Sequence, residues 1–263
     1  MVRALHLVSL VGVLWSLGAA ASPSPDTRTG LEIATEARDR DRGFGDSRAS
    51  ITMTLRNQRG DQTKRVMRSR TLEMANDGDR SMVIFDRPRD VAGTVFLNFT
   101  HRNKDDDQWL YLPALGRVKR IASSNKSGPF MGSEFSYEDL SSPEVEKYDY
   151  LRLDDETEDD REYFVLQRTP KDLRSGYRRM VVWLDKDHYR AFKVDFYDRR
   201  DTLLKTLTTQ QFTRHAGRFW RPVSMLMVNH QSGRSTRLDW ADYTFGNGYS
   251  EADFNRNNLS KLR

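Results

Sequence analysis

After residue 21, the side chains best suited to acid–base or metal chemistry are four histidines, His101, His188, His215 and His230. They are far apart in the sequence, and no two have the spacing of a metal site on a helix. The H-E-x-x-H pattern of zinc hydrolases and the G-x-S-x-G pattern of a nucleophile elbow are both absent. We therefore expect a protein that is not an enzyme and has no catalytic residue, metal or cofactor.

Two acidic runs are the other candidates for chemistry. Residues 105–107 are three aspartates, and residues 154–160 read DDETEDD. The longer run lacks the glycine and the alternating ligands of an EF-hand loop, so a solvated hairpin loop is the better interpretation than a calcium site. Because the chain has no cysteine, it has no disulfide, no thiolate nucleophile and no cysteine-ligated metal.

The N-terminus has the order of a secretory signal. Arg3 precedes an apolar run, residues 7–17, and small residues end at Ala21. We expect residues 1–21 to be a signal peptide cleaved near Ala21 and residues 22–30 to be a flexible lead-in. A retained membrane anchor is the alternative, but the apolar run is shorter than the roughly 20 residues that span a bilayer. The expected location is the periplasm.

The charge balance bears on partners. Forty-three basic and 38 acidic residues give a net charge of +5, with both signs interspersed. This pattern argues against a nucleic-acid partner, whereas peripheral contact with an anionic membrane surface is compatible with it. The composition gives no indication of oligomeric state.

From residue 46 onward, the dominant hydrophobic period is two, which is typical of half-buried strands. Ala49, Ile51, Met53 and Leu55 show it first. The same reading predicts further strands at residues 64–74, 81–85, 94–100, 109–112, 117–121, 147–153, 162–168, 177–184, 190–197, 203–212, 219–229 and 236–243. About a dozen sequential, mostly antiparallel strands predict one large curved sheet or an incomplete barrel. Pro222 suggests a sheet edge or a bulge.

Helices are expected only near the two ends of this sheet domain. Residues 31–42 predict one helix with Leu31, Ala34 and Arg38 on one face, ended by the glycines that follow. The tail, residues 250–262, predicts a short helix with Phe254 and Leu259 packing inward. We expect a single domain over residues 31–263.

One internal segment, residues 122–146, does not have the pattern of a strand. Loops longer than about 12–15 residues in a compact domain are usually functional or disordered. This one contains Phe130, Phe135 and Tyr137, which argues against simple disorder. We expect a packed loop or lid with a helical turn at residues 137–140.

At this segment the chain resembles a known family. Residues 107–121, DQWLYLPALGRVKRI, and residues 127–140, SGPFMGSEFSYEDL, look like the signature of LolA-like outer-membrane lipoprotein-sorting proteins. Residues 82–88, MVIFDRP, also fit, and the likeness covers nearly the whole chain after the signal. The resemblance implies a LolA- and LolB-like unclosed β-barrel around an apolar cavity, with a lid of loops or short helices. It also implies transport of lipoprotein or lipid between the inner and outer membranes, alongside an efflux-type inner-membrane transporter.

The resemblance turns the apolar strand faces into candidates for a ligand-binding cavity wall. These residues are Ile51, Met53, Leu55, Val95, Leu97, Phe99, Phe192, Val194, Phe196, Met225, Met227, Leu238 and Trp240. The same alternation also fits an ordinary filled core. The candidates for the lid or rim are Trp109, Tyr111, Phe130, Met131, Phe135 and Tyr137. Their alternative is plain packing of the loop on the sheet.

A basic cluster, Arg117, Lys119 and Arg120, lies beside the lid candidates in the sequence. It is suited to a phosphate or acidic headgroup, or to docking an acidic partner, although Lys and Arg are also common on solvated strand edges. The function expected is therefore a periplasmic carrier of an apolar ligand, such as lipoprotein acyl chains or lipid. The alternative is a non-catalytic envelope adaptor that docks onto an inner-membrane efflux-type transporter.

Overall fold

The computed structural model describes residues 26–262, so the expected signal peptide lies outside the described part. Helix α1 (Gly30–Asp41) comes first. The strands that follow it are β1 (Asp46–Arg56), β2 (Gln62–Leu72), β3 (Arg80–Arg87), β4 (Val95–Phe99), β5 (Asp107–Leu112) and β6 (Arg117–Ile121). After a non-strand segment come β7 (Tyr148–Arg152), β8 (Glu156–Glu158), β9 (Arg161–Pro170), β10 (Tyr177–Asp185), β11 (Ala191–Asp198), β12 (Leu203–His215), β13 (Phe219–Asn229) and β14 (Arg234–Phe245).

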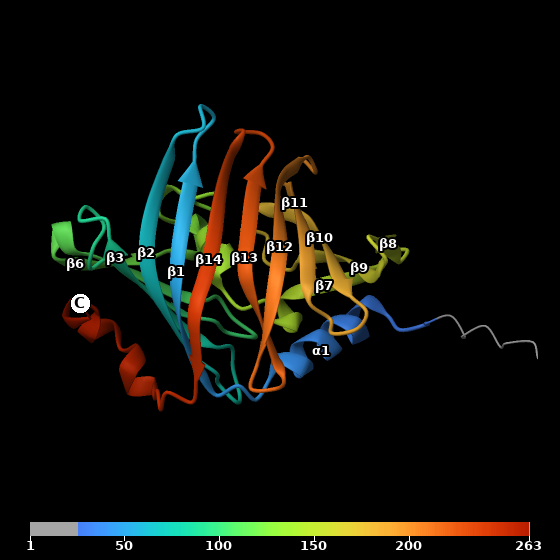
Figure 1. Cartoon of the computed structure of the whole chain (residues 1–263), viewed down its shortest axis with the longest axis horizontal. Helices are drawn as coiled ribbons and strands as arrows, with labels where there is room; N and C mark the ends of the chain where they lie inside the picture. Colours follow the sequence, from blue (N-terminus) through green and yellow to red (C-terminus); the bar gives the residue numbers. More distant parts are fainter. Residues whose placement is uncertain (1–25, 263) are drawn as a thin grey trace, which may run out of the picture.

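The fourteen strands of the described residues form one curved antiparallel sheet, as predicted (Figure 1). Its order is β6-β5-β4-β3-β2-β1-β14-β13-β12-β11-β10-β9-β7, with β8 pairing only with β9. The two halves of the sheet meet where β1 pairs with β14, at Met53 opposite Leu238. Because β6 and β7 each pair on one side only, the barrel is not closed.

Helix α1 lies against the second half of the sheet and contacts β7, β9 and β13 (Figure 1). A capping box starts it: Thr29 Oγ1 accepts from the Glu32 amide, and the Glu32 carboxylate accepts from the Thr29 amide. The buried face of the helix carries Ile33, which is fully buried, whereas Leu31 is 53 % exposed. Of the face that was expected to carry Leu31, Ala34 and Arg38, Ala34 packs against the core together with Ile33 and Ala37, because these three lie on one side of a helix with a 3.6-residue period.

The helix also starts very close to the sheet. A Cβ at Gly30 would lie 2.9 Å from the Arg152 amide nitrogen of β7. Only glycine allows this approach without a shift of the backbone, so Gly30 sets the depth at which α1 sits over the strands.

The sheet has apolar side chains on both faces in its first half. One set, which we call the concave cluster, includes Met53, Met67, Phe85, Phe96, Leu110, Phe164, Leu166, Val182, Phe196, Met227 and Leu238. The other set, the outer cluster, consists of Met82, Ile84, Val95, Leu97, Trp109, Tyr111, Phe254 and Leu259. The last two belong to the 3-10 helices η6 (Glu251–Phe254) and η7 (Arg256–Lys261), so the tail packs as predicted and covers the outer face of β3 to β6.

The segment between β6 and β7, residues 122–147, is the lid segment. It contains η2 (Ser123–Asn125), η3 (Phe130–Gly132), η4 (Tyr137–Leu140) and η5 (Val145–Lys147); the remaining short helix is η1 (Pro113–Leu115). Phe130 and Phe135 are 1 % and 4 % exposed and belong to the concave cluster. The prediction of a packed segment with a helical turn at residues 137–140 is confirmed.

Pro222 lies in the interior strand β13 and not at an edge, so the bulge is the alternative that holds. The register shifts where Gln211 and Phe212 of β12 face Ser224 and Pro222, which leaves Val223 of β13 as the extra residue. The acidic run 154–160 is not wholly a loop, because Glu156–Glu158 forms β8. Its turn, Asp159 and Asp160, has positive φ at both residues, which is the backbone of a tight hairpin.

Candidate ligand-binding cavity

A cavity of about 870 Å³ lies between α1 and the second half of the sheet. Its floor is apolar and comes from β7, β9, β10 and β13, which contribute Tyr150, Leu166, Val182, Leu184 and Met225. The apolar side chains that the helix contributes to its roof are the small Ala34 and Ala37, and the charged residues 36 and 38–41 of the helix also line the cavity. Because alanines stand where larger residues would fill the space, the helix leaves room over the sheet. The volume is within the range of about 300–1,000 Å³ that is usual for ligand pockets.

Charged side chains surround this floor. Nine arginines and seven carboxylates line the cavity. Several of the arginines are neutralised: Arg38 lies 2.9 Å from Glu146, Arg40 lies 2.6 Å from Glu36, and Arg221 pairs with Asp41. The cavity therefore combines an apolar interior with a basic excess, an arrangement suited to molecules that have both apolar and anionic parts.

Trp220 forms an aromatic side of the cavity. The His188 ring stacks on it at 4.9 Å, and the Arg190 guanidinium lies 4.4 Å from its ring centroid. Arg190 is held by Asp185, which is fully buried and accepts from Arg190 Nε at 2.6 Å and from the His188 amide at 2.6 Å. The β10–β11 turn is thus preorganised by one buried carboxylate.

Carboxylates at the other side of the cavity have raised pKa values. Burial, together with the charges of Glu144, Glu73 and Asp41, raises the pKa of Asp79 to about 7. Burial also raises the pKa of Asp41 and of Glu144. Because like charges are close together there, one proton is retained near neutral pH.

The lid segment is fixed by a buried polar network. Lys205 Nζ of β12 lies 2.6 Å from Asp139 Oδ2, and Tyr177 OH donates to Asp139 Oδ1 at 2.7 Å. Glu138 accepts from Ser175 Oγ and the Gly176 amide, at 2.8 and 2.9 Å. These contacts join the segment to the β9–β10 turn, β10 and β12, so it is latched onto the concave face.

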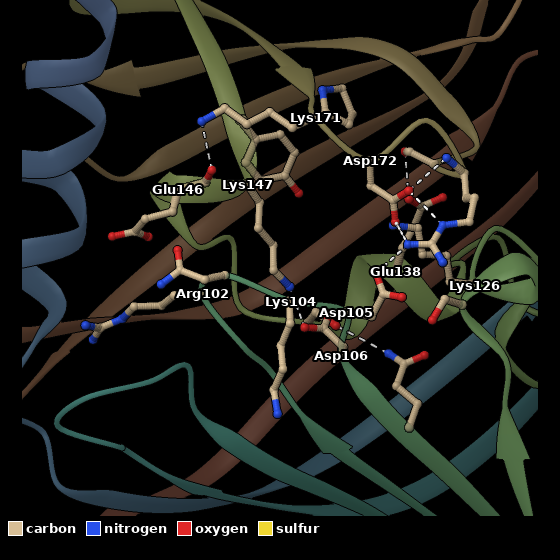
Figure 2. A pocket seen from close by; sticks show the side chains of 18 of the residues that line it. Arg102, Lys104, Asp105, Asp106, Lys126, Glu138, Glu146, Lys147, Lys171 and Asp172 are labelled. Atoms are coloured by element: carbon tan, nitrogen blue, oxygen red, sulfur yellow. Dashed lines mark hydrogen bonds and ion pairs between the residues drawn. The ribbon is translucent and has the colours of Figure 1, made fainter.

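A second pocket, of about 610 Å³, is polar and lies where the lid segment, β7 and the β4–β5 and β9–β10 loops meet. Figure 2 shows Lys147 extending toward Asp106, with which it pairs. Lys126 lies 2.7 Å from Asp172. These two lysine–aspartate pairs tie the two ends of the sheet together across this pocket.

The structure separates the expected cavity-wall residues. The set that packs in or against the concave cluster is Ile51, Met53, Leu55, Val194, Phe196, Met227, Leu238 and Trp240. Only Met225 of the thirteen lines the larger cavity. Val95, Leu97 and Phe99 pack in or against the outer cluster, and Phe192 contacts Tyr163 and Phe212 instead. The single wall that was expected is therefore divided between the two faces.

The lid and headgroup candidates are divided in the same way. Phe130, Met131, Phe135 and Tyr137 pack in or against the concave cluster, whereas Trp109 and Tyr111 lie in the outer cluster under the tail. Arg117, Lys119 and Arg120 are exposed on the edge strand β6, and Arg120 lies 2.7 Å from Asp107. None of these three lines either pocket described above.

Sequence reasoning missed Lys205 and Arg168. Lys205 stands between Leu203 and Leu207, and Arg168 follows Phe164 and Leu166 at the same two-residue spacing. A charged residue at a position where the alternation calls for an apolar one is the signal that could have found both.

Residues 26–262 contain no group of three or more His, Asp or Glu side chains placed to hold a metal ion. No helix among them has the length and apolar character needed to cross a bilayer.

The comparisons with known proteins agree with this fold. A family model described only as an uncharacterized protein matches residues 77–261. A domain from Vibrio parahaemolyticus, described as an outer membrane lipoprotein-sorting protein, is 55 % identical over 88 % of this chain and 98 % of its own, with a TM-score of 0.86. A DUF1329 family protein from Desulfovibrio piger is 32 % identical over 88 % and 97 %, with a TM-score of 0.83.

A more distant structure has the same fold. A LolA superfamily protein from Nitrosomonas europaea is 22 % identical over 88 % of this chain and 99 % of its own, with a TM-score of 0.69. No curated protein matches the chain. From the identity to the Vibrio domain and the unclosed fourteen-stranded sheet, we conclude that the chain belongs to the LolA-like family of outer-membrane lipoprotein-sorting proteins.

Proposed function

We propose that this protein is a non-catalytic periplasmic carrier that holds an apolar ligand, lipoprotein acyl chains or lipid, in the cavity between α1 and the sheet. The observation that carries the proposal is that cavity: about 870 Å³, with a floor of Leu166, Val182, Leu184 and Met225. The family to which the chain belongs, through a relative described as a lipoprotein-sorting protein, supports the same role.

The physics of transfer favours such a site. Each methylene buried in an apolar cavity contributes about 0.8 kcal/mol, so a chain of about 16 carbons gains at most about 12 kcal/mol before ordering costs. A membrane offers a similar gain, so a carrier needs strong but reversible binding. Small alanines between the helix and the sheet suit this requirement. They leave room for the ligand, which is buried there without tight packing around it.

The proposal includes the processing of the chain. Cleavage near Ala21 would release the mature protein into the periplasm, with residues 31–263 as one domain. An inner-membrane transporter is the proposed source of the cargo, and the exposed basic strand β6 (Arg117, Lys119 and Arg120) is the proposed docking site for it or for an anionic membrane surface.

Native mass spectrometry with lipid extraction tests the proposal. The full chain is expressed with its own N-terminus in a bacterial periplasm and purified without detergent. A bound species of defined mass, released on unfolding, is the expected result. A ligand-free mass, together with no uptake of a fluorescent fatty acid or lipopeptide afterwards, would refute the carrier and favour an adaptor that docks on a transporter without holding cargo.

A further inference from the structure

Arg168 projects into the larger cavity from the strand face that is otherwise apolar. It lies on β9, two residues beyond Leu166, and pairs across the sheet with Met180 and Tyr150. All three of these neighbours pack in or against the concave cluster. Because alternate residues of a strand share a face, the Arg168 guanidinium is on the ligand side of the sheet.

Within the part of the chain that the structure describes, Arg168 has no counter-ion. No carboxylate lies within 4.0 Å of its nitrogens, and its Nε is buried without a hydrogen-bond partner. The guanidinium lies against the Tyr148 ring, whose centroid is 5.1 Å from Cζ. The nearby Glu146 is paired instead with Arg38, at 2.9 Å.

A half-buried charge without a partner is costly, since a guanidinium loses hydration that no carboxylate replaces. An unpartnered buried polar group of a folded protein calls for an explanation, and a bound ion is one. Tyr150 also lines the cavity beside Arg168, and burial raises the pKa of its hydroxyl to about 12, so the hydroxyl is a donor at neutral pH. Two donor side chains therefore line the same cavity beside its apolar floor.

We propose that the cavity takes a long-chain carboxylate whose head is bound by Arg168 and Tyr150 and whose tail lies along Leu166, Val182, Leu184 and Met225. This deepens the proposed function, on which it rests, by naming the class of cargo. A planar carboxylate matches the fork of a guanidinium. One unpaired cation balances one negative charge, whereas a doubly charged phosphate monoester would bring a second charge near Glu146.

The rim of the cavity supports an anionic ligand independently. Three arginines there, the half-buried Arg42 and the exposed Arg214 and Arg218, have no carboxylate within 4.0 Å among the described residues. Cations at the mouth of a low-dielectric cavity attract anions and raise their rate of entry. They guide the head inward to Arg168 without being required to hold it.

Displacement of the neutral fluorescent probe N-phenyl-1-naphthylamine from the purified full chain tests the inference. Dodecanoate, dodecanol, dodecyl phosphate and acetate are compared, each below its aggregation concentration. We expect dodecanoate to displace the probe at a concentration about tenfold or more below that of dodecanol, because a charge-assisted hydrogen bond adds to the same tail contacts. Acetate should have no effect, since it lacks the tail.

The variants are Arg168→Met, Arg168→Lys and the matched control Arg178→Met, which removes an exposed arginine from the adjacent strand β10. Arg168→Met should abolish the preference for dodecanoate over dodecanol while changing dodecanol binding less than about twofold; Arg168→Lys should retain part of the preference, and the control all of it. The ligand-free Tm of Arg168→Met should stay equal or rise, because an unpaired buried charge is removed.

Four results would overturn the inference. The first is equal displacement by dodecanol and dodecanoate in the wild type. The second is displacement by acetate, and the third is a tenfold advantage of dodecyl phosphate over dodecanoate. The fourth is a fall of several degrees in the ligand-free Tm of Arg168→Met, which would make Arg168 a structural residue. The first leaves the carrier role intact. Failure of the probe and of every amphiphile to bind would instead refute the proposed carrier itself.

Discussion

Lys205 Nζ and Asp139 Oδ2 lie 2.6 Å apart although 66 residues separate them in the chain, and their side chains are only 5 % and 6 % exposed. The pair joins β12 to the lid segment on the concave face of the sheet. In a low-dielectric site, such a pair makes the position of the segment depend on two specific side chains.

Removing one member of this pair should destabilise the protein strongly. Lys205→Met leaves the Asp139 carboxylate buried without its cation, so we expect the free energy of unfolding to fall by about 3–5 kcal/mol in urea titrations. The double variant Lys205→Met with Asp139→Leu should lose less, because neither charge remains. Lys171→Met, which breaks a pair of exposed side chains with Asp149, is the control; a loss as small as the control's would contradict the latch.

Filling the space under α1 should block ligand capture. Ala37→Phe places an aromatic ring in the roof of the cavity, so we expect about tenfold less bound lipid in native mass spectra, with the Tm monitored in parallel. Leu31→Phe adds a similar ring to the exposed face of the same helix and should keep wild-type occupancy. If both variants carry as much lipid as the wild type, the cargo does not lie under α1.

The outer cluster should contribute to stability without contributing to ligand binding. Phe254 of the tail is 1 % exposed against β3 and β4, so Phe254→Ala should cost about 3–5 kcal/mol through the cavity it leaves. Binding of N-phenyl-1-naphthylamine, measured where the variant remains folded, should be unchanged. Weaker binding by about tenfold would show that the outer face belongs to the ligand site.

Asp79 should make stability fall as pH rises. Burial and neighbouring carboxylates raise its pKa to about 7 in the folded protein, from 3.8 ordinarily. A raised carboxyl pKa favours the folded state at low pH, and this contribution is lost as pH rises from about 4 to about 7. Asp79→Asn should therefore stabilise the protein more at pH 8 than at pH 4.

The expected difference between those two pH values is at least about 1.4 kcal/mol, which is what a single unit of pKa shift provides. Thermal melts of the variant and the wild type across this range measure it. Asp239→Asn, an exposed carboxylate that pairs with Arg237, should give parallel curves. A variant with the same pH dependence as the wild type would contradict the raised pKa.

The alternation of apolar and polar residues was sufficient to predict the sheet, because each strand shows this two-residue period on its own. The face assignments depended on more than that pattern. In β4, Val95, Phe96 and Leu97 are all buried, so alternation cannot tell which of them points to the concave side. That choice is made by the tail, which covers Val95 and Leu97, and by the lid segment, which covers Phe96.

The cavity could not be predicted from the two-residue alternation, for a similar reason. Its existence depends on how α1 and the lid segment divide the concave face, and the lid segment fills much of the part that was expected to be open. Arg168 and Lys205 look alike in the sequence, as charges at apolar positions. Only the fold shows that Lys205 has a carboxylate partner, Asp139, and that Arg168 has none among residues 26–262.

The pairing of β1 with β14 has a consequence for the order of folding. In a chain made from its N-terminus, β1 to β6 can form by successive local hairpins, whereas the other edge of β1 has no partner until β14 has been synthesised. Such distant pairings are slow to form, and an unpaired strand edge is a template for aggregation. Folding of this protein should therefore end with the closure of its central seam, and until then the nascent chain depends on protection of one β1 edge.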